Sequence, residues 1–91
     1  MIRLNCFIKV NEGKYDQVLE AARKLTEASI KQDGCIAYDI FTSATRKDVF
    51  LICETWADQK SLDNHANSEE YKKYSPEMRE GAELKLEKFE F

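Results

Sequence analysis

Three side chains able to do acid–base chemistry or bind a ring lie close together between Val49 and Tyr74. Glu54 and Trp56 end an apolar run, and His65 follows in a polar segment; the chain has no other Trp or His. A carboxylate and an indole interrupt a pattern that is otherwise typical of a buried strand, and such breaks mark functional sites. An imidazole accepts a proton near neutral pH because its unperturbed pKa is about 6.5. The spacing predicts a site at a strand-to-helix junction.

His65 shares a predicted helical stripe with Leu62 and Ala66, so its ring should face the sheet. A buried carboxylate without a partner is costly, so Glu54 needs one. A contact between Glu54 and His65 would satisfy both groups and fix the imidazole tautomer. Two interpretations follow: a proton-transfer pair in a pocket, or a structural clamp between helix and strand. Trp56 is expected to be a packing anchor and pocket wall.

Other polar side chains are candidates for the same site. Asn5 lies on the opening strand, on the face that carries Phe7 and opposite the more apolar stripe. Its amide could bind a substrate carbonyl or dioxygen; the alternative is a surface or interface Asn. Tyr38 or Tyr71 could supply a hydroxyl to a pocket, the alternative being amphipathic packing.

The first half of the chain predicts a strand and a helix that position these residues. Apolar and polar residues alternate from Met1 to Val10, which is typical of a half-buried strand. After Gly13, apolar residues recur at spacings of three and four to about Lys31, which predicts an amphipathic helix lying on a sheet. Asp33-Gly34 follows as its stop signal.

The next segment predicts two antiparallel strands. They cover Cys35 to Thr42 and Val49 to Trp56, and a short polar link joins them. The second strand is apolar on both faces for most of its length. We therefore expect a central strand covered on both sides.

The last part of the chain predicts a helix and a closing strand. Asp58 is a plausible N-cap, and the helix should run through Tyr74 until Ser75-Pro76 separates it from a short helix to about Ala82. Glu83 to Phe91 predicts the final strand. Its large apolar residues switch face along its length, which indicates a bulge or an end packed on a neighbouring subunit.

The predicted order is β-α-β-β-α-β in one domain covering residues 1–91, an α+β fold of the ferredoxin-like type. The four-stranded antiparallel sheet carries both helices on one face. The second face would still bear large apolar groups, so a second copy of the chain is its natural cover.

Composition narrows the classes of partner. The chain has 14 Lys and Arg against 17 Asp and Glu, and it has no basic block, which argues against nucleic acid. No apolar run approaches the roughly 20 residues that span a bilayer, and the opening alternation is unlike a signal peptide, so a cytoplasmic protein without membrane contact is expected. Cys6, Cys35 and Cys53 lack C-x-x-C spacing and predict reduced, buried thiols and no metal site.

The string Glu54-x-Trp56, five residues, Leu62, two residues, His65, and then Ser68, resembles the antibiotic biosynthesis monooxygenase domain family, including quinol monooxygenase-like members. The resemblance covers essentially the whole chain. It implies a homodimer in which two sheets pack face to face as a dimeric α/β barrel, with a pocket between sheet and helices in each subunit.

The chain departs from the family pattern at one position. Many members with the first His have a second one five residues later, where this chain has Glu70. The haem-degrading branch has a Trp in place of His65 and a His where Ser75 stands, so haem is not expected.

The resemblance, with no flavin, nicotinamide or metal signature, suggests a cofactor-independent monooxygenase acting with O2 on a phenolic or quinol-type aromatic substrate. In that hypothesis His65 takes the phenolic proton, Asn5 stabilises the reduced oxygen and Trp56 walls out water. Substrate contacts are expected from Glu54, Trp56, Tyr38 and Tyr71. The alternatives are an isomerase or other small-molecule enzyme of the same fold, and a non-catalytic ligand-binding or dimerisation module.

Overall fold

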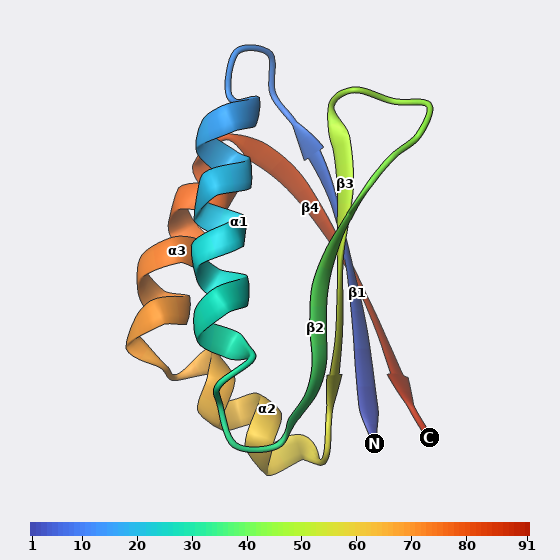
Figure 1. Ribbon diagram of the computed structural model, residues 1–91, viewed down its shortest axis with the longest axis vertical. Coiled ribbons are helices and arrows are strands. Elements are labelled where there is room, and N and C mark those ends of the chain that lie inside the picture. Colours follow the sequence, from blue (N-terminus) through green and yellow to red (C-terminus); the bar gives the residue numbers. More distant parts are fainter.

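The computed structural model describes residues 1–91 and confirms the α+β ferredoxin-like fold (Figure 1). It has four strands and three helices, and the third helix is longer than the short one predicted after Ser75-Pro76. In chain order these are β1 (Ile2–Val10), α1 (Tyr15–Ser29), β2 (Cys35–Thr42), β3 (Val49–Trp56), α2 (Gln59–Ala66), α3 (Glu69–Glu80) and β4 (Ala82–Glu90).

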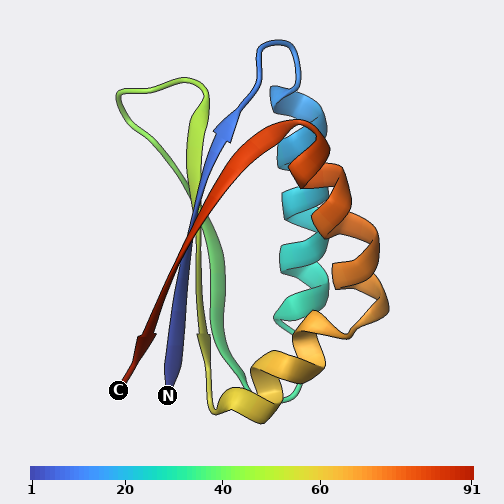
Figure 2. The same cartoon turned by 180° about the vertical axis from the view of Figure 1, so that it is seen from behind.

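The strands form one antiparallel sheet in the order β2-β3-β1-β4. All three helices lie on the same side of it, which leaves the other side of the sheet uncovered (Figures 1 and 2). The two chain ends lie side by side at one end of the sheet, where the Phe91 amide donates to the Met1 carbonyl.

The core fills the space between the sheet and α1. Residues with even numbers on β1 and β3 face the helices and are buried, so the predicted alternation of β1 is confirmed. The apolar stripe of α1 packs on them, as its three-and-four spacing predicts. The best-buried side chains of this core are Trp56, Phe50, Ile8, Leu25, Ile52 and Val18.

The expectation that β3 is covered on both sides is wrong within this chain. β3 is central in the sheet, between β2 and β1, but only its Phe50 and Ile52 face lies under the helices. Leu51 and Cys53 on the other face are partly exposed, because no helix packs there. The apolar residues on the second face of β3 therefore belong to a surface that the chain itself does not bury.

The break between the last two helices falls at Asn67-Ser68 and not at Ser75-Pro76. The Ser68 hydroxyl caps α3 by accepting from the Tyr71 amide at 3.2 Å, and it donates to the His65 carbonyl at 2.7 Å. Two acidic residues fill the first turn of α3, which favours a start there. Pro76 lies inside α3, on its exposed side, where water can satisfy the carbonyl that its ring leaves unpaired.

The closing strand has no bulge. Its register with β1 is unbroken from Val10 opposite Ala82 to Ile2 opposite Glu90. The apolar residues switch face because Lys88 and Glu90 continue the helix-side row of Leu84 and Leu86, while Phe89 lies on the open side. The one register shift in the sheet is in β2, between Cys35 and Ala37.

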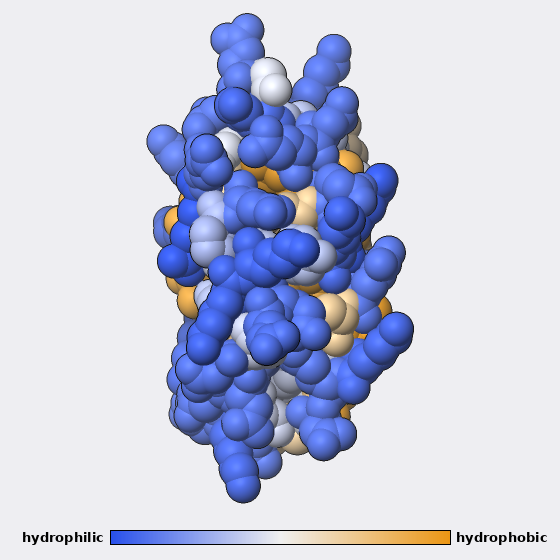
Figure 3. Space-filling view, turned by 90° about the vertical axis from the view of Figure 1, so that its left-hand side faces the viewer, coloured by the Kyte–Doolittle hydropathy of each residue, from blue (hydrophilic) through white to orange (hydrophobic).

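The two surfaces of the molecule differ in character. The outer face of the helix layer is largely hydrophilic (Figure 3). The open face of the sheet carries Phe7, Phe41 and Phe89, which are 39%, 54% and 50% exposed. A second copy packed on this face stays a prediction. No helix in the structure combines the length and apolar character needed to cross a membrane.

Replacing the cap of α3, Ser68→Ala, should lower the free energy of unfolding by about 1 kcal/mol, because the N-cap acceptor and the link to α2 are lost together. Urea denaturation measures this. Lys72→Ala, at an exposed position of the same helix, is the control and should change stability by less than about 0.5 kcal/mol. Equal effects of the two substitutions would contradict the capping role.

Candidate functional site

A cavity of about 510 Å³ lies between the helices and the sheet. Most of its wall is apolar, and each of the four strands and three helices contributes to it. Leu4 and Cys6 of β1 and Leu84 and Leu86 of β4 form its sheet side, while Leu62 and Met78 belong to its helix side. Its volume and apolar lining suit a small organic molecule.

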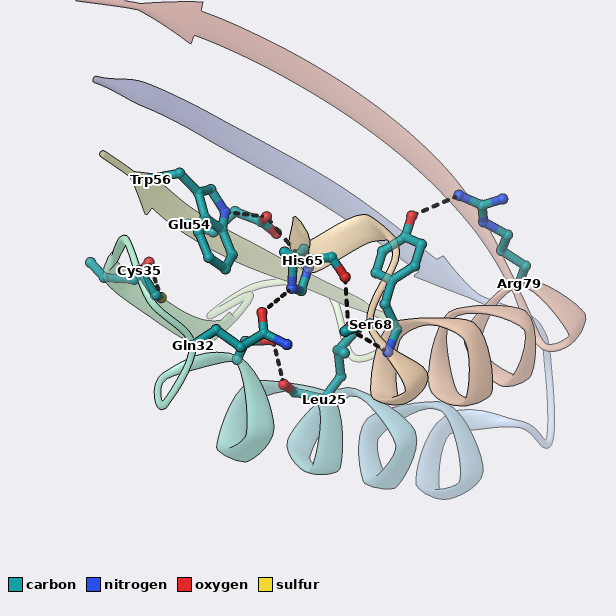
Figure 4. A network of polar contacts seen from close by, with 11 residues as sticks. Leu25, Gln32, Cys35, Glu54, Trp56, His65, Ser68 and Arg79 are labelled. Carbon is teal, nitrogen blue, oxygen red and sulfur yellow. Dashed lines mark hydrogen bonds and ion pairs between the residues drawn. The ribbon is translucent and has the colours of Figure 1, made fainter. Parts of the chain in front are cut away.

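Glu54 and His65 line this cavity, and Trp56 contacts both of them (Figure 4). Trp56 is the predicted packing anchor, but its fully buried ring does not form part of the cavity wall. The Trp56 indole Nε1 donates to Glu54 Oε1 at 2.8 Å, and His65 Nε2 lies 3.9 Å from the same oxygen. All three side chains are buried. The structure therefore places Glu54 beside His65 as the sequence suggests, but with a gap too wide for a direct hydrogen bond.

His65 has a second partner that the sequence did not reveal. Its Nδ1 lies 2.8 Å from Oε1 of Gln32, in the turn between α1 and β2. An amide oxygen only accepts, so Nδ1 carries the proton of the neutral ring. The unprotonated Nε2 is then directed toward Glu54. Gln32 resembles any polar turn residue in the sequence, and no local pattern connects it with His65.

Aromatic rings enclose the imidazole. The Trp56 ring lies 4.6 Å from it between centroids and is tilted by 33°, while the Tyr71 ring meets it edge-on at 5.1 Å and the Tyr38 ring lies at 5.7 Å. Tyr38 stands opposite Glu54 in the β2–β3 register. The structure thus brings both candidate tyrosines to the site, and both line the cavity.

Burial shifts the pKa values of Glu54 and His65 in opposite directions. Desolvation raises the pKa of Glu54 to about 7, although hydrogen bonding from Trp56 and Tyr38 partly offsets it. Desolvation lowers the pKa of His65 to about 4. The pKa of Tyr38 is also raised, first by burial and then by Glu54. Near neutral pH the imidazole is uncharged, and Glu54 is the group poised to gain or lose a proton.

Asn5 is not part of this group. It pairs with Cys53 on β3 and Glu87 on β4, on the open face of the sheet, while its neighbours Leu4 and Cys6 face the cavity. The sheet therefore separates its amide from His65 within one chain. The expectation of a shared site for Asn5 and His65 is corrected by this alternation.

The prediction of buried thiols is confirmed for Cys6 only. All three are free; Cys6 is buried in the cavity wall, and Cys35 and Cys53 are partly exposed. Burial first, and then Glu54, raises the pKa of Cys6 to about 11, so its thiol stays protonated and is a poor nucleophile. No three side chains of the His, Cys, Asp and Glu types come together in a way that could hold a metal ion.

Comparison with known proteins decides the family. The family model described as antibiotic biosynthesis monooxygenase matches residues 1–77. This chain belongs to the antibiotic biosynthesis monooxygenase family. One relative is the "Putative monooxygenase YcnE" of Bacillus subtilis (strain 168), 31% identical over 65 residues that cover 71% of this chain and 68% of that protein.

Solved structures of similar fold extend the comparison. A conserved protein of unknown function from Bacteroides thetaiotaomicron VPI-5482, described as "Possible Oxidoreductase", is 51% identical with a TM-score of 0.96, and the match covers 99% of this chain and 96% of that chain. SnoaB from Streptomyces nogalater, described as a cofactor-independent oxygenase, is 9% identical with a TM-score of 0.87 over 99% of this chain and 91% of its own. The likeness to SnoaB shows a shared fold only.

Removing the charge of Glu54 tests its raised pKa through stability. A pKa raised on folding stabilises the protein at low pH, and this contribution is lost as pH rises from the unfolded value of about 4.5 through about 7. Glu54→Gln should therefore gain stability relative to wild type between about pH 4 and pH 8, by on the order of 3 kcal/mol. Urea denaturation at both pH values measures it. Glu87→Gln, at an exposed position, should show no such trend. A stability difference between Glu54→Gln and wild type that is the same at both pH values would contradict the raised pKa of Glu54.

The single histidine makes a direct titration of the site practical. NMR signals of the His65 ring should titrate with a pKa of about 4 in the wild type. Gln32→Glu places a carboxylate at Nδ1 and should raise that pKa by about one unit or more. Gln17→Glu, on the exposed side of α1, should leave it unchanged. If the pKa of His65 is the same in the wild type and in both variants, Gln32 does not contact the ring in solution.

Proposed function

We propose that this protein is a monooxygenase that oxidises a phenolic or quinol-type small molecule with O2 and needs no prosthetic group. The observation that carries the proposal is the buried Glu54–His65 pair at the wall of an apolar, aromatic cavity, in a chain of this family. The arrangement offers a base to the substrate within a mostly apolar lining.

The gap between Glu54 and His65 suits a substrate hydroxyl. The two atoms that face each other, Oε1 and Nε2, are 3.9 Å apart. An oxygen placed between them can lie about 2.8 Å from each, within hydrogen-bond range of both. The hydroxyl has one proton, and both the ionised Glu54 and the unprotonated Nε2 are acceptors, so the proton passes to Glu54, the more basic of the two. Gln32 keeps the proton of the ring on Nδ1, so Nε2 does not donate to Glu54 and leaves the carboxylate free to accept from the substrate.

Deprotonation makes the ring electron-rich enough to reduce dioxygen. One electron passes from the phenolate to O2, and recombination of the two radicals forms the new carbon–oxygen bond. The proton held by Glu54 then passes to the resulting peroxide, which restores the ionised carboxylate. For a hydroquinone, loss of water then gives a hydroxyquinone, so that hydroquinone and O2 become hydroxyquinone and water. The substrate supplies all the electrons. Asn5 has no part in this step within one chain, because it lies on the open face.

Oxygen uptake by the purified protein with a panel of hydroquinones tests the proposal. We expect uptake above the background rate and a rate that rises with pH through an apparent pKa near 7, as Glu54 ionises. Glu54→Gln should slow the reaction roughly 100-fold, and His65→Ala should slow it as well. Glu87→Gln serves as the control. No uptake above background, or an unchanged rate in both site variants, would refute the proposal.

An isomerase acting on a carbonyl compound is the second candidate. The same carboxyl–imidazole pair could move a proton between adjacent carbons without oxygen, since its two members differ in proton affinity. Turnover under strict anaerobiosis would favour this function. A purely structural clamp is less well supported, because an open cavity lies beside the pair and no side chain fills it.

A further inference from the structure

The polar groups of the cavity fall into two sets at different depths. Glu54 and His65 are buried. Gln59, Asp63, Arg79 and Lys88 are exposed and form a polar rim. The wall between the two sets is mostly apolar, so a ligand that fills the cavity has an inner end, an apolar body and an outer end.

Most of the rim groups already have partners. Lys88 Nζ donates to Gln59 Oε1 at 2.7 Å and lies 3.6 Å from Glu90. Gln59 Nε2 in turn donates to Asp63 at 2.8 Å. These contacts leave the charges of Lys88 and Asp63 engaged within the protein.

Arg79 differs from the rest of the rim. No carboxylate lies within ion-pair distance of its guanidinium, and its one side-chain contact is a 3.4 Å hydrogen bond to the Tyr71 hydroxyl (Figure 4). Most of its five N–H donors are therefore free for a ligand. The ring of the same tyrosine meets the His65 ring edge-on at 5.1 Å between centroids, so Tyr71 contacts both Arg79 and the buried pair.

The charge of Arg79 also reaches the interior of the cavity. The pKa of Cys6, in the sheet-side wall, is lowered by Arg79 while burial and Glu54 raise it. A cation and a carboxyl group therefore act on the same cavity atom. The chain as a whole has a net charge of −3, so any attraction for an anion at this point is local.

We propose that Arg79 binds a carboxylate on the substrate, so that the substrate class is an aromatic acid with its oxidisable hydroxyl at the inner end of the cavity. The identity of the reacting end rests on the proposed function; the anion site does not. A guanidinium binds a carboxylate through two parallel hydrogen bonds. Arg79 is the one basic residue in the last turn of α3, where the negative end of the helix dipole stabilises its charge, and it offers one guanidinium to one carboxylate.

A pair of ligands that differ in one group tests this inference. Methylhydroquinone and (2,5-dihydroxyphenyl)acetate share a ring and differ by the carboxylate. Calorimetry under anaerobic conditions measures their affinities without turnover. We expect the acid to bind the wild type at least about tenfold more tightly, and Arg79→Gln to abolish that preference. Arg23→Gln, on the exposed side of α1 and away from the cavity, should retain it.

The outcomes separate this inference from the proposed function. Equal affinities in the wild type, no binding of the acid, or a preference that survives in Arg79→Gln would overturn the anion site. Uptake of oxygen with methylhydroquinone would still support the monooxygenase in that case. Conversely, an Arg79-dependent preference without oxygen uptake would support the anion site and refute the oxidation. Circular dichroism of Arg79→Gln verifies that the variant is folded.

Discussion

The burial of one carboxyl group, that of Glu54, is the constraint on which the rest of the site depends. A central strand places it under the helices, where an isolated anion is costly. The Trp56 indole donates to it, and the neutral His65 ring stands beside it. The pKa of Glu54 rises as a result, so this carboxyl group can exchange a proton near neutral pH.

The fold supplies what this group needs by placing all helices on one side of the sheet. The strand holds Glu54 and Trp56 on successive positions of one face, and α2 brings His65 down onto them. Ser68 links the end of α2 to the start of α3, so the segment that carries His65 has fixed ends. The opposite face of the sheet is left with exposed aromatic residues, which is consistent with a partner surface distinct from the site.

Much of this arrangement could be predicted from local patterns. Period-two alternation placed β1, and the strand-to-helix junction brought Glu54 and His65 together. The Gln32 contact could not be predicted, because it joins a turn and a helix that are distant in sequence.

The helix break was predicted at Ser75-Pro76, but it lies at Asn67-Ser68, because the Ser68 side chain caps α3 and Pro76 is tolerated inside that helix. Asn5 was assigned to the site although alternation alone puts it on the face opposite Leu4 and Cys6. The reversed proton affinities of Glu54 and His65 arise from burial, which the sequence does not quantify.

The most direct test of the account is whether the cavity ionises a bound phenol. Ultraviolet difference spectroscopy of a bound hydroquinone, in the absence of oxygen, distinguishes the phenol from its phenolate. We expect a phenolate signal in the wild type that grows as pH rises through about 7 and disappears in Glu54→Gln. A ligand that binds in the cavity and stays un-ionised at every pH, or that ionises equally well in Glu54→Gln, would contradict it.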